Sequence, residues 1–366
     1  MKYDVIIAGG GVAGLSTSIF LKGLNPKYKI LVLEKDKYPY QRKYGSSINP
    51  KGLQDLKWLR KLEKKLPFQK PSQIEFISPD FSKKATFRDK TMASWISHED
   101  IENHLVKVAK DLDVEFHFSF PIIKVEAGIE GVCLKSEKKE IEGEVLVGAD
   151  GKDSQVAKQL GIYEDLSHYS TYYGIYEIIS LPKKGLSPMV SINYGKKFGY
   201  AYLWPFPKFI QIGLFLKEES FLEEVFQDWK SHLAKEKYLP ADKEGKKVRR
   251  DVPAGAALLL ERSYDKRTVL VGDAGGFVVN TTAEGLYPAM LSAKIASEII
   301  HKGLKEKRMD DIIPSYSREW NLAFGEYIRG TIELNRNLNF LIEMIFSDPK
   351  ICTRYGRGFF LGEKVI

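Results

Sequence analysis

The sequence is poor in cysteine, because Cys133 and Cys352 are its two cysteines among 366 residues. Two cysteines are too few for a disulfide framework, and their separation does not match the ligand spacing of a zinc or iron–sulfur site. We therefore expect no metal site. A cytoplasmic location is expected as well, since chains without disulfides are typical of a reducing compartment.

Long apolar runs are also lacking. No segment of the sequence approaches the ~20 apolar residues that a membrane-spanning helix needs. The first residues, Met1-Lys2-Tyr3-Asp4, lead into a short apolar run without the pattern of a signal peptide. A chain of 366 residues exceeds what one hydrophobic core usually serves, so the sequence predicts two closely connected domains.

Acidic residues are in the minority, with 48 Asp and Glu against 56 Lys and Arg and a formal net charge of +8. The basic residues are spread along the chain and are not interleaved with aromatic residues, so we expect no nucleic-acid partner. Two interpretations of the charge stay open. We favour a solvated surface rich in lysine and glutamate; the alternative is peripheral contact with the anionic inner face of a membrane.

The N-terminal region contains a glycine-rich turn between two apolar runs. Gly9-Gly10-Gly11-Val12-Ala13-Gly14 follows the run 3–8 and opens a predicted helix over about 13–24, and a second run, 30–33, ends at Glu34. In such a unit Gly9 allows the tight turn, Gly11 lets the backbone approach a pyrophosphate, and Gly14 lets the helix pack on the strand. Glu34 can accept hydrogen bonds from a ribose diol. The unit predicts dinucleotide binding without separating FAD from NAD.

Two glycine–aspartate blocks each follow another apolar run. Gly148-Ala149-Asp150-Gly151 is the first, and Gly272-Asp273 is the second, which leads through residues 281–285 into a predicted helix. An aspartate at a strand end can bond a ribityl hydroxyl, and a helix N-terminus can stabilise the electron-rich edge of a reduced isoalloxazine ring. Either block alone fits an ordinary turn. Together with the first turn they resemble the flavoprotein hydroxylase and reductase superfamily.

Within that superfamily the chain most resembles the geranylgeranyl reductase family. Residues 271–290, V-G-D-A-G-G-F-V-V-N-T-T-A-E-G-L-Y-P-A-M, are similar to that family's block G-D-A-A-G-F-x-x-P-x-T-G-E-G-I-x-x-A-M. Residues 202–207, Y-L-W-P-F-P, resemble its aromatic element Y-x-W-x-F-P. The resemblance covers nearly the whole chain and implies an FAD-dependent enzyme that reduces isoprenoid double bonds.

The resemblance also implies two sets of contacts. Residues expected to contact FAD are Gly9, Gly11, Val12, Ala13, Gly14, Glu34, Lys35, Arg42, Gly45, His98, Asp150, Gly272, Asp273, Gly285 and Leu286. Residues expected to line a lipid cavity beside the flavin are Tyr44, Tyr202, Trp204 and Phe206.

The chain departs from the family's pattern at several of these positions. Tyr44 stands near a position where the family often has cysteine, and His98 replaces a flavin-contacting arginine. Asn280 and Ala283 replace a proline and a glycine of the third block. We expect His98 to be a flavin contact or a packing residue rather than a proton shuttle. The alternating aromatic residues of 202–206 fit a cavity lining, which we favour, or the packed face of a strand.

The expected fold is α/β, with a Rossmann-type FAD-binding domain interleaved with an antiparallel-sheet substrate domain and followed by a helical C-terminus. The FAD-binding domain is assigned to residues 1–70, 94–155 and 258–300, the sheet domain to 71–93 and 156–257, and the helical segment to 301–366. Residues 97–112 have helical periodicity with Ser97 as N-cap. Residues 168–216 contain short β-branched and aromatic runs typical of antiparallel strands.

The leading functional prediction is an FAD-dependent reductase that saturates carbon–carbon double bonds of a geranylgeranyl-type prenyl lipid by hydride transfer from reduced flavin. No second nucleotide fingerprint is visible, so the electron donor is expected to be a ferredoxin-like protein or a reduced nicotinamide. One alternative is a monooxygenase or halogenase that acts on an aromatic substrate through a flavin hydroperoxide, and Asn280 keeps it open. Another is a flavin-binding electron carrier or sensor without catalysis.

Overall fold

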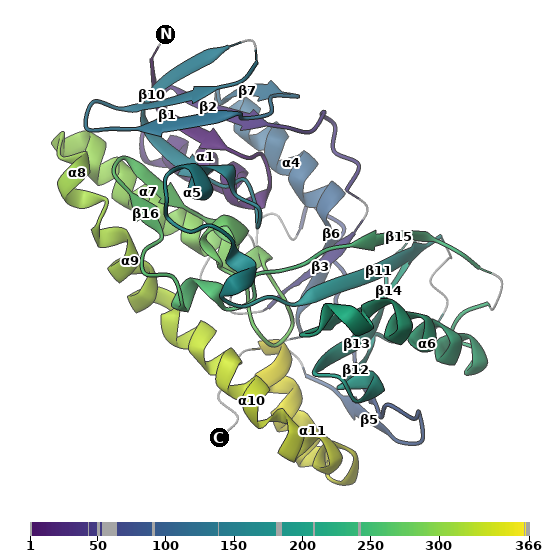
Figure 1. Ribbon diagram of the computed structural model, residues 1–366. Coiled ribbons are helices and arrows are strands. Elements are labelled where there is room, and N and C mark those ends of the chain that lie inside the picture. The colour runs from purple at the N-terminus through teal and green to yellow at the C-terminus, as the bar shows by residue number, and fades with distance from the viewer. Residues whose placement is uncertain are drawn as a thin grey trace.

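The computed structural model describes residues 2–42, 44–49, 52, 64–89, 92–137, 139–180, 185–207, 209–240, 243–361 and 363, and their side chains except those of 335–341. Residues 53–63, which the sequence analysis assigns to the FAD-binding domain, lie outside the described residues. Two sheets lie at opposite ends of the molecule, and long helices run beside both of them (Figure 1).

The first sheet has the strand order β16-β17-β10-β1-β2-β7. Its strands are β1 (Tyr3–Ala8), β2 (Ile30–Glu34), β7 (Glu115–Phe118), β10 (Glu140–Gly148), β16 (Tyr264–Asp265) and β17 (Thr268–Leu270), with β8 (Lys124–Ala127) and β9 (Val132–Lys135) attached through β10. Strands β17, β10, β1, β2 and β7 are parallel, and Ile6 of β1 pairs with Leu146 on one side and Leu31 on the other. Their carboxyl ends therefore meet at one edge, where α/β folds bind ligands.

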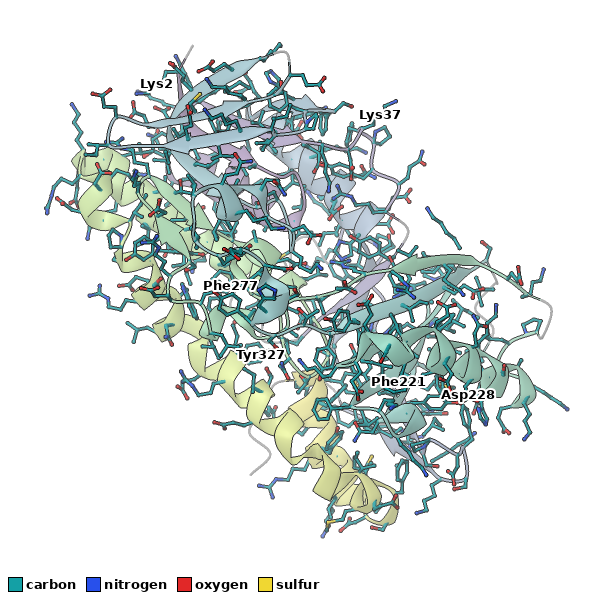
Figure 2. The ribbon with its side chains drawn as sticks, in the orientation of Figure 1. Lys2, Lys37, Phe221, Asp228, Phe277 and Tyr327 are labelled. Carbon is teal, nitrogen blue, oxygen red and sulfur yellow. The ribbon has the colours of Figure 1, made fainter. Side chains whose placement is uncertain are left out.

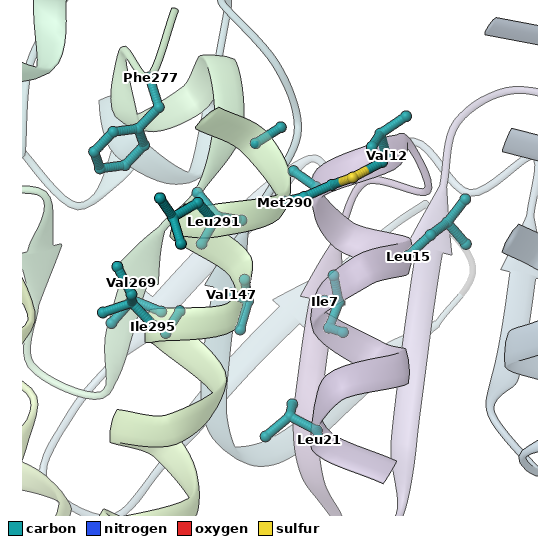
Figure 3. Packing of buried hydrophobic residues seen from close by; sticks show 14 of the residues in the cluster. Ile7, Val12, Leu15, Leu21, Val147, Val269, Phe277, Met290, Leu291 and Ile295 are labelled. Atoms are coloured by element: carbon teal, nitrogen blue, oxygen red, sulfur yellow. The ribbon is translucent and has the colours of Figure 1, made fainter. Parts of the chain in front are cut away.

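Helices cover both faces of this sheet, as a parallel sheet of apolar strands requires. On one face α1 (Val12–Leu24) packs against α7 (Leu286–Glu306) and α4 (His98–Asp111). Figure 3 shows Leu15 and Leu21 of α1 and Met290 and Leu291 of α7 above the sheet. On the other face, α5 (Gln155–Gln159) packs against the opposite side chains of the same strands.

The second sheet has the order β15-β11-β14-β13-β12-β4-β5. Its strands are β4 (Ile74–Ile77), β5 (Lys84–Phe87), β11 (Tyr173–Ile179), β12 (Met189–Ile192), β13 (Gly199–Pro205), β14 (Ile210–Leu216) and β15 (Lys246–Arg249). The pairs are antiparallel except β12 with β4, which are parallel. The segment 71–93 thus contributes two strands to the same sheet as 173–249.

Alternate residues of β13 face different partners. Ala201 and Leu203 pack with Phe226 and Trp229 of α6 (Leu222–Lys235). Tyr200, Tyr202 and Trp204 point to the other face, toward the segment around Phe359 and Phe360. The period of two in the aromatic element therefore separates a buried aliphatic layer from an aromatic layer.

The C-terminal region is helical and connects the two sheets. It contains α8 (Met309–Ile312), α9 (Ser315–Trp320), α10 (Glu326–Ser347) and α11 (Pro349–Gly356), followed by a π-helical turn at Arg357–Leu361. In Figure 1 the helices α8 to α11 run from the first sheet to the second, with the colour changing from light green to yellow, and Tyr327, near the start of α10, lies near the middle of the molecule in Figure 2. A short ribbon, β3 (Gly45–Ile48) paired with β6 (Ser94–Ser97), lies between the sheets.

The predicted fold class is confirmed, including the interleaving of the two sheets along the chain and the helical C-terminus. The residue limits of the domains stay a prediction. The limit proposed at 300–301 falls inside α7, which continues to Glu306. Among the described residues, no helix is both long and apolar enough to cross a membrane.

Candidate active site

The turn after β1 holds its glycines close to neighbouring backbone. Gly9 has a φ of 107°, and a Cβ on it would lie 2.2 Å from the carbonyl oxygen of Ala149. A Cβ on Gly14 would lie 2.0 Å from the carbonyl oxygen of Gly9, so a larger residue would push α1 away from β1. At Gly11, by contrast, the nearest atom to such a Cβ is Glu102 Oε1 at 3.8 Å. The backbone at Gly11 therefore has room for a close ligand.

Glu34 ends β2 beside this turn and is 4% exposed. Its Oε2 accepts a hydrogen bond from the Gly10 amide at 2.9 Å, and its Oε1 accepts one from the Asp36 amide at 2.9 Å. The Tyr40 hydroxyl lies 3.5 Å from Oε2 and the Arg42 guanidinium 3.4 Å from it, so the remaining acceptor capacity lies mainly on Oε1, since a carboxylate can accept about four hydrogen bonds. The side chain is thus held in place and can still accept from a hydroxyl.

Arg42 crosses from this carboxylate to α4. Its guanidinium lies 3.4 Å from Glu34 and 2.5 Å from Asp36, and it donates to Glu102 Oε2 at 3.0 Å. Burial lowers the pKa of Arg42, but the carboxylates of Glu102, Asp36 and Glu34 outweigh this and raise it overall. Arg42 is a permanent cation at this edge.

His98 is the first residue of α4 and is buried. Its Nδ1 lies 3.1 Å from Glu102 Oε1, one turn along the helix, and its Nε2 lies 2.9 Å from Ser46 Oγ on β3. The Tyr44 ring packs on the imidazole with centroids 4.3 Å apart. The Arg250 guanidinium in turn lies 4.5 Å from the centroid of the Tyr44 ring.

The two aspartates of the glycine–aspartate blocks have different partners. Asp150 accepts from Ser154 Oγ at 2.6 Å and from the amides of Gln155 and Val156, so it caps the start of α5. Asp273, which is partly exposed, lies 3.7 Å from Arg250. Gly272, just before it, has a φ of 60° and lies against Ala13 of α1.

The start of α7 contributes Gly285, Leu286 and a buried acid, Glu284. Glu284 Oε1 accepts from the Tyr287 amide at 3.1 Å, and Oε2 accepts from Asn49 Nδ2 at 3.2 Å. Asn49 Nδ2 also contacts the Tyr327 hydroxyl. Burial raises the pKa of Glu284 to about 8, although both hydrogen bonds oppose the shift. This carboxyl is therefore mostly protonated at neutral pH.

A cavity of about 610 Å³ connects these groups. Its lining includes thirteen of the fifteen expected FAD contacts, namely Gly9, Gly11, Val12, Ala13, Glu34, Lys35, Arg42, Gly45, His98, Asp150, Asp273, Gly285 and Leu286. Gly14 and Gly272 lie behind the wall, where they bring α1 against its neighbours.

The second sheet closes the other end of the cavity with aromatic side chains. Tyr202 and Trp204 line it, as does Tyr44. Phe206 does not; it stacks on Phe209 with centroids 4.5 Å apart and lies close to Gly45. Three of the four expected aromatic residues therefore line the cavity, namely Tyr44 before β3 and Tyr202 and Trp204 on β13, while Phe206 is a packing residue after the end of β13.

Several lining residues escaped the sequence analysis. They are Ser46, Glu102, Tyr176, Tyr200, Gln211, Phe215, Arg250, Glu284, Phe359 and Phe360. Gln211 had a visible signal, because it is a lone amide between aliphatic residues of β14. Its side chain accepts from the Gly45 amide at 2.8 Å and donates to the Tyr202 hydroxyl at 2.9 Å, so it ties β3 to the aromatic wall.

The geometry fits FAD. Glycine backbone and the start of α1 offer amides to a pyrophosphate, the positioned Glu34 offers acceptors to a ribose, and Asp273 lies beside the start of α7. Arg42 and Arg250 supply positive charge near these carboxylates. Among the described residues, no group of three or more His, Cys, Asp or Glu side chains is arranged to hold a metal ion.

Comparison with known proteins gives one family. Residues 2–328 match the family model described as FAD binding domain. Digeranylgeranylglycerophospholipid reductase 2 of Methanothermobacter thermautotrophicus is 23% identical over 358 residues, which cover 93% of this chain and 88% of that protein.

Solved structures of low sequence identity share the fold. A geranylgeranyl bacteriochlorophyll reductase-like protein from Thermoplasma acidophilum superposes with a TM-score of 0.75 at 14% identity, covering 98% of this chain and 96% of that one. A flavin-dependent brominase gives 0.74 at 16% identity, with 100% and 95% covered. The same fold is thus found in a protein named as reductase-like and in a protein named as a brominase.

Proposed function

Because the chain belongs to the FAD binding domain family and is an FAD-dependent oxidoreductase, we propose that it saturates carbon–carbon double bonds of a prenyl lipid. The reduced flavin supplies the hydride that such a reaction needs. The protein's part is to hold the alkene against the cofactor, to exclude water and to provide a proton, because an isolated double bond is weakly polarised.

The observation that carries the proposal is the aromatic end of the cavity. Tyr200, Tyr202, Trp204 and Phe215 from the second sheet meet Phe359 and Phe360 from the C-terminal segment around the same space that the glycine turn enters. An isoprenoid chain has no polar groups to bond, so its affinity must come from apolar burial, at up to ~0.8 kcal/mol for each buried methylene.

Two of the hydroxyl groups in this wall, those of Tyr200 and Tyr202, have hydrogen-bond partners in the protein. Tyr202 receives the Gln211 amide at 2.9 Å, and the Tyr200 hydroxyl donates to the Thr282 carbonyl at 2.6 Å. A polar group that is satisfied internally asks no hydrogen bond of the ligand. The aromatic rings present apolar faces to the cavity, which favours binding of a hydrocarbon chain.

The FAD contacts and the substrate contacts are part of the same proposal. We assign the first thirteen residues named for the cavity to the cofactor, with Gly14 and Gly272 as packing support, and Tyr44, Tyr202 and Trp204 to the lipid. Phe206 then supports the wall from behind. A ferredoxin-like protein or a reduced nicotinamide would reduce the flavin, and peripheral contact with a membrane would bring the lipid to the cavity.

The test is anaerobic reduction of geranylgeraniol and of digeranylgeranylglycerophospholipid by the FAD-loaded protein, with dithionite as reductant and mass spectrometry of the products. We expect addition of hydrogen pairs. Trp204→Leu should lower the rate about tenfold, since a lost aromatic contact is worth ~1 kcal/mol or more, while leaving the flavin bound. Tyr169→Leu, at an exposed aromatic residue outside the cavity lining, is the control and should change the rate little.

The outcome that contradicts the proposal is equally concrete. If neither lipid is reduced, and an aromatic substrate is instead hydroxylated or halogenated only when oxygen is admitted, the protein is an oxygenase. Equal loss of activity in the Trp204 and Tyr169 variants would show that the aromatic wall does not bind the substrate.

A further inference from the structure

A hydrogen-bonded chain of three side chains runs along the cavity wall. Ser46 Oγ lies 2.9 Å from His98 Nε2, and His98 Nδ1 lies 3.1 Å from Glu102 Oε1. The far oxygen of Glu102 accepts from Arg42 at 3.0 Å. His98 and Glu102 are buried, whereas Ser46 is half-buried and lines the cavity.

The position of Ser46 gives this chain a direction. Ser46 follows Gly45, whose amide donates to Gln211 of the aromatic sheet. Glu102, at the other end, lies beside Gly11 of the glycine turn. The serine therefore stands where the cofactor cradle meets the aromatic wall, which is where an alkene and the cofactor would come together.

From this geometry we propose that Ser46, His98 and Glu102 form a proton relay, in which His98 exchanges a proton with the reacting centre through the Ser46 hydroxyl. The same order of groups activates serine as a nucleophile in hydrolases. A reductase that adds hydrogen to an alkene needs a proton in addition to the hydride, and the same order of groups can supply that proton. The choice of an alkene as substrate rests on the proposed function, but the relay itself does not.

With this relay, every hydrogen and every bond in the reduction of an alkene is accounted for. With reduced flavin bound, one alkene carbon would accept a hydride from it, so that the flavin would be oxidised and the π bond would break. The other carbon takes the Ser46 hydroxyl proton while His98 Nε2–H passes its proton to Ser46 Oγ. His98 is left neutral with its remaining proton on Nδ1, facing Glu102, and solvent restores the lost proton.

Glu102 is a positioning residue in this scheme. Its carboxylate accepts from Nδ1–H and so fixes the ring orientation and the tautomer, as a carboxylate behind a histidine commonly does. Its second oxygen is held by Arg42, which keeps the carboxylate from turning toward Ser46. The alternative is a purely structural role, in which Glu102 neutralises Arg42 and His98 packs at the start of α4.

The groups that face His98 set the pH at which the relay is loaded. Burial lowers the pKa of His98, hydrogen bonding and charge from Glu102 oppose this, and Arg250 and Arg42 lower it further; Tyr44 stacks on the ring. A relay that gives away a proton works only with His98 protonated. Its rate should therefore fall as the pH rises through a pKa below the ordinary histidine value.

The first test needs no substrate. The midpoint potential of the bound flavin is measured by spectroelectrochemistry from about pH 5 to about pH 9 for wild type, His98→Gln and, as control on the same helix, His104→Gln. If His98 takes up or releases a proton with the redox state, wild type and His98→Gln should diverge by about tenfold in the redox equilibrium, or about 30 mV for two electrons. His104→Gln should follow wild type. Parallel curves for wild type and His98→Gln would overturn the relay.

The second test uses single turnovers of dithionite-reduced protein with geranylgeraniol. The wild-type rate should fall with rising pH, and His98→Gln and Ser46→Ala should be slower by ~10²-fold or more, the usual scale for a lost general acid, with a flat pH profile. Glu102→Gln should give an intermediate rate. Rates in Ser46→Ala that equal wild type with an unchanged pH profile would overturn the relay. If wild type reduces no prenyl lipid, the proposed function is wrong. The flavin midpoint potentials of the first test then determine by themselves whether the relay exists.

Discussion

Asp273 is the residue whose charge we expect to matter most for cofactor retention. It stands between Arg250, at 3.7 Å, and the start of α7. Asp273→Asn should weaken FAD binding by roughly tenfold to a hundredfold, since a charge-assisted hydrogen bond contributes about 1.5–3 kcal/mol. The measurement is a fluorescence titration of the deflavinated protein with FAD.

Asp311→Asn on α8 serves as the control, because Asp311 is exposed and forms an ion pair with Arg308, three residues earlier. Its FAD affinity should equal that of wild type. An Asp273→Asn protein that keeps its flavin through gel filtration as wild type does would show that this carboxylate is not a cofactor contact.

Glu284 should make stability depend on pH in an unusual direction. Burial raises its pKa from 4.5 to about 8, so the folded protein favours the protonated form. The group therefore stabilises the fold at low pH and loses this contribution as the pH rises toward about 8. Glu284→Gln imitates the protonated acid and should be more stable than wild type by up to ~5 kcal/mol at alkaline pH, because the pKa moves from 4.5 to about 8 and each pKa unit corresponds to ~1.4 kcal/mol.

Thermal unfolding at about pH 5 and about pH 8.5 tests this, because the difference between variant and wild type should be much larger at the higher pH. Glu298→Gln, on an exposed turn of the same helix, should show no such dependence. A Glu284→Gln protein whose advantage is the same at both pH values would mean that the carboxyl ionises normally.

Some residues of the site could be predicted from the sequence, and others could not. Glu34 and Asp273 were found because each follows an apolar strand, and strand ends of a parallel sheet converge. Arg250 follows β15 in the other sheet, next to Arg249, and looked like one more surface charge. Its place over Tyr44 depends on how the two sheets meet, which no local pattern encodes. Ser46, His98 and Glu102 were missed as a unit for the same reason, since they come from two separate elements.

At the scale of elements, α1 contains a matched pair of glycines. A Cβ on Gly14 would lie 2.0 Å from backbone, whereas a Cβ on Gly23 would meet no atom within 4 Å. Gly23→Ala should raise stability by about 0.5–1 kcal/mol through helix propensity and reduced freedom of the unfolded chain. Gly14→Ala should instead lower both stability and FAD affinity, because α1 must move away from β1.

Chemical denaturation and FAD titration of both variants check this prediction. The two substitutions are chemically identical and lie in one helix, so general effects of alanine cancel in the comparison. Equal stability of the two proteins would mean that the close packing of α1 on β1 is not as tight as the distance implies.

Helices and strands with a clear local sequence pattern were predictable, whereas the pairing of strands with one another was less so. The buried run of β1, the N-cap Ser97 of α4 and the long apolar face of α7 gave these elements close to their observed bounds. The order of the second sheet could not be read in the same way. Strand β12 pairs with β4, more than a hundred residues earlier, through backbone bonds that leave no periodic trace.

For the molecule as a whole, the net charge of +8 yields a test of membrane contact. If the basic surface holds the protein at an anionic bilayer, it should sediment with vesicles that contain phosphatidylglycerol at about 0.05 M salt and much less at about 0.5 M, because the Debye length shortens severalfold. Vesicles of phosphatidylcholine are the control. No sedimentation at low salt would leave the charge as an ordinary solvated surface.

The route of the chain through the two sheets has a consequence for biosynthesis. Strand β1 leaves the ribosome early, yet its neighbour β10 and then β17 follow only after residues 140 and 268. Phe359 and Phe360 emerge later than every other wall of the cavity. A nascent chain that captured flavin as soon as its first sheet closed would hold it in a vestibule open to water and oxygen. A flavin site closed against water therefore requires that residues 359 and 360 have been synthesised and have docked.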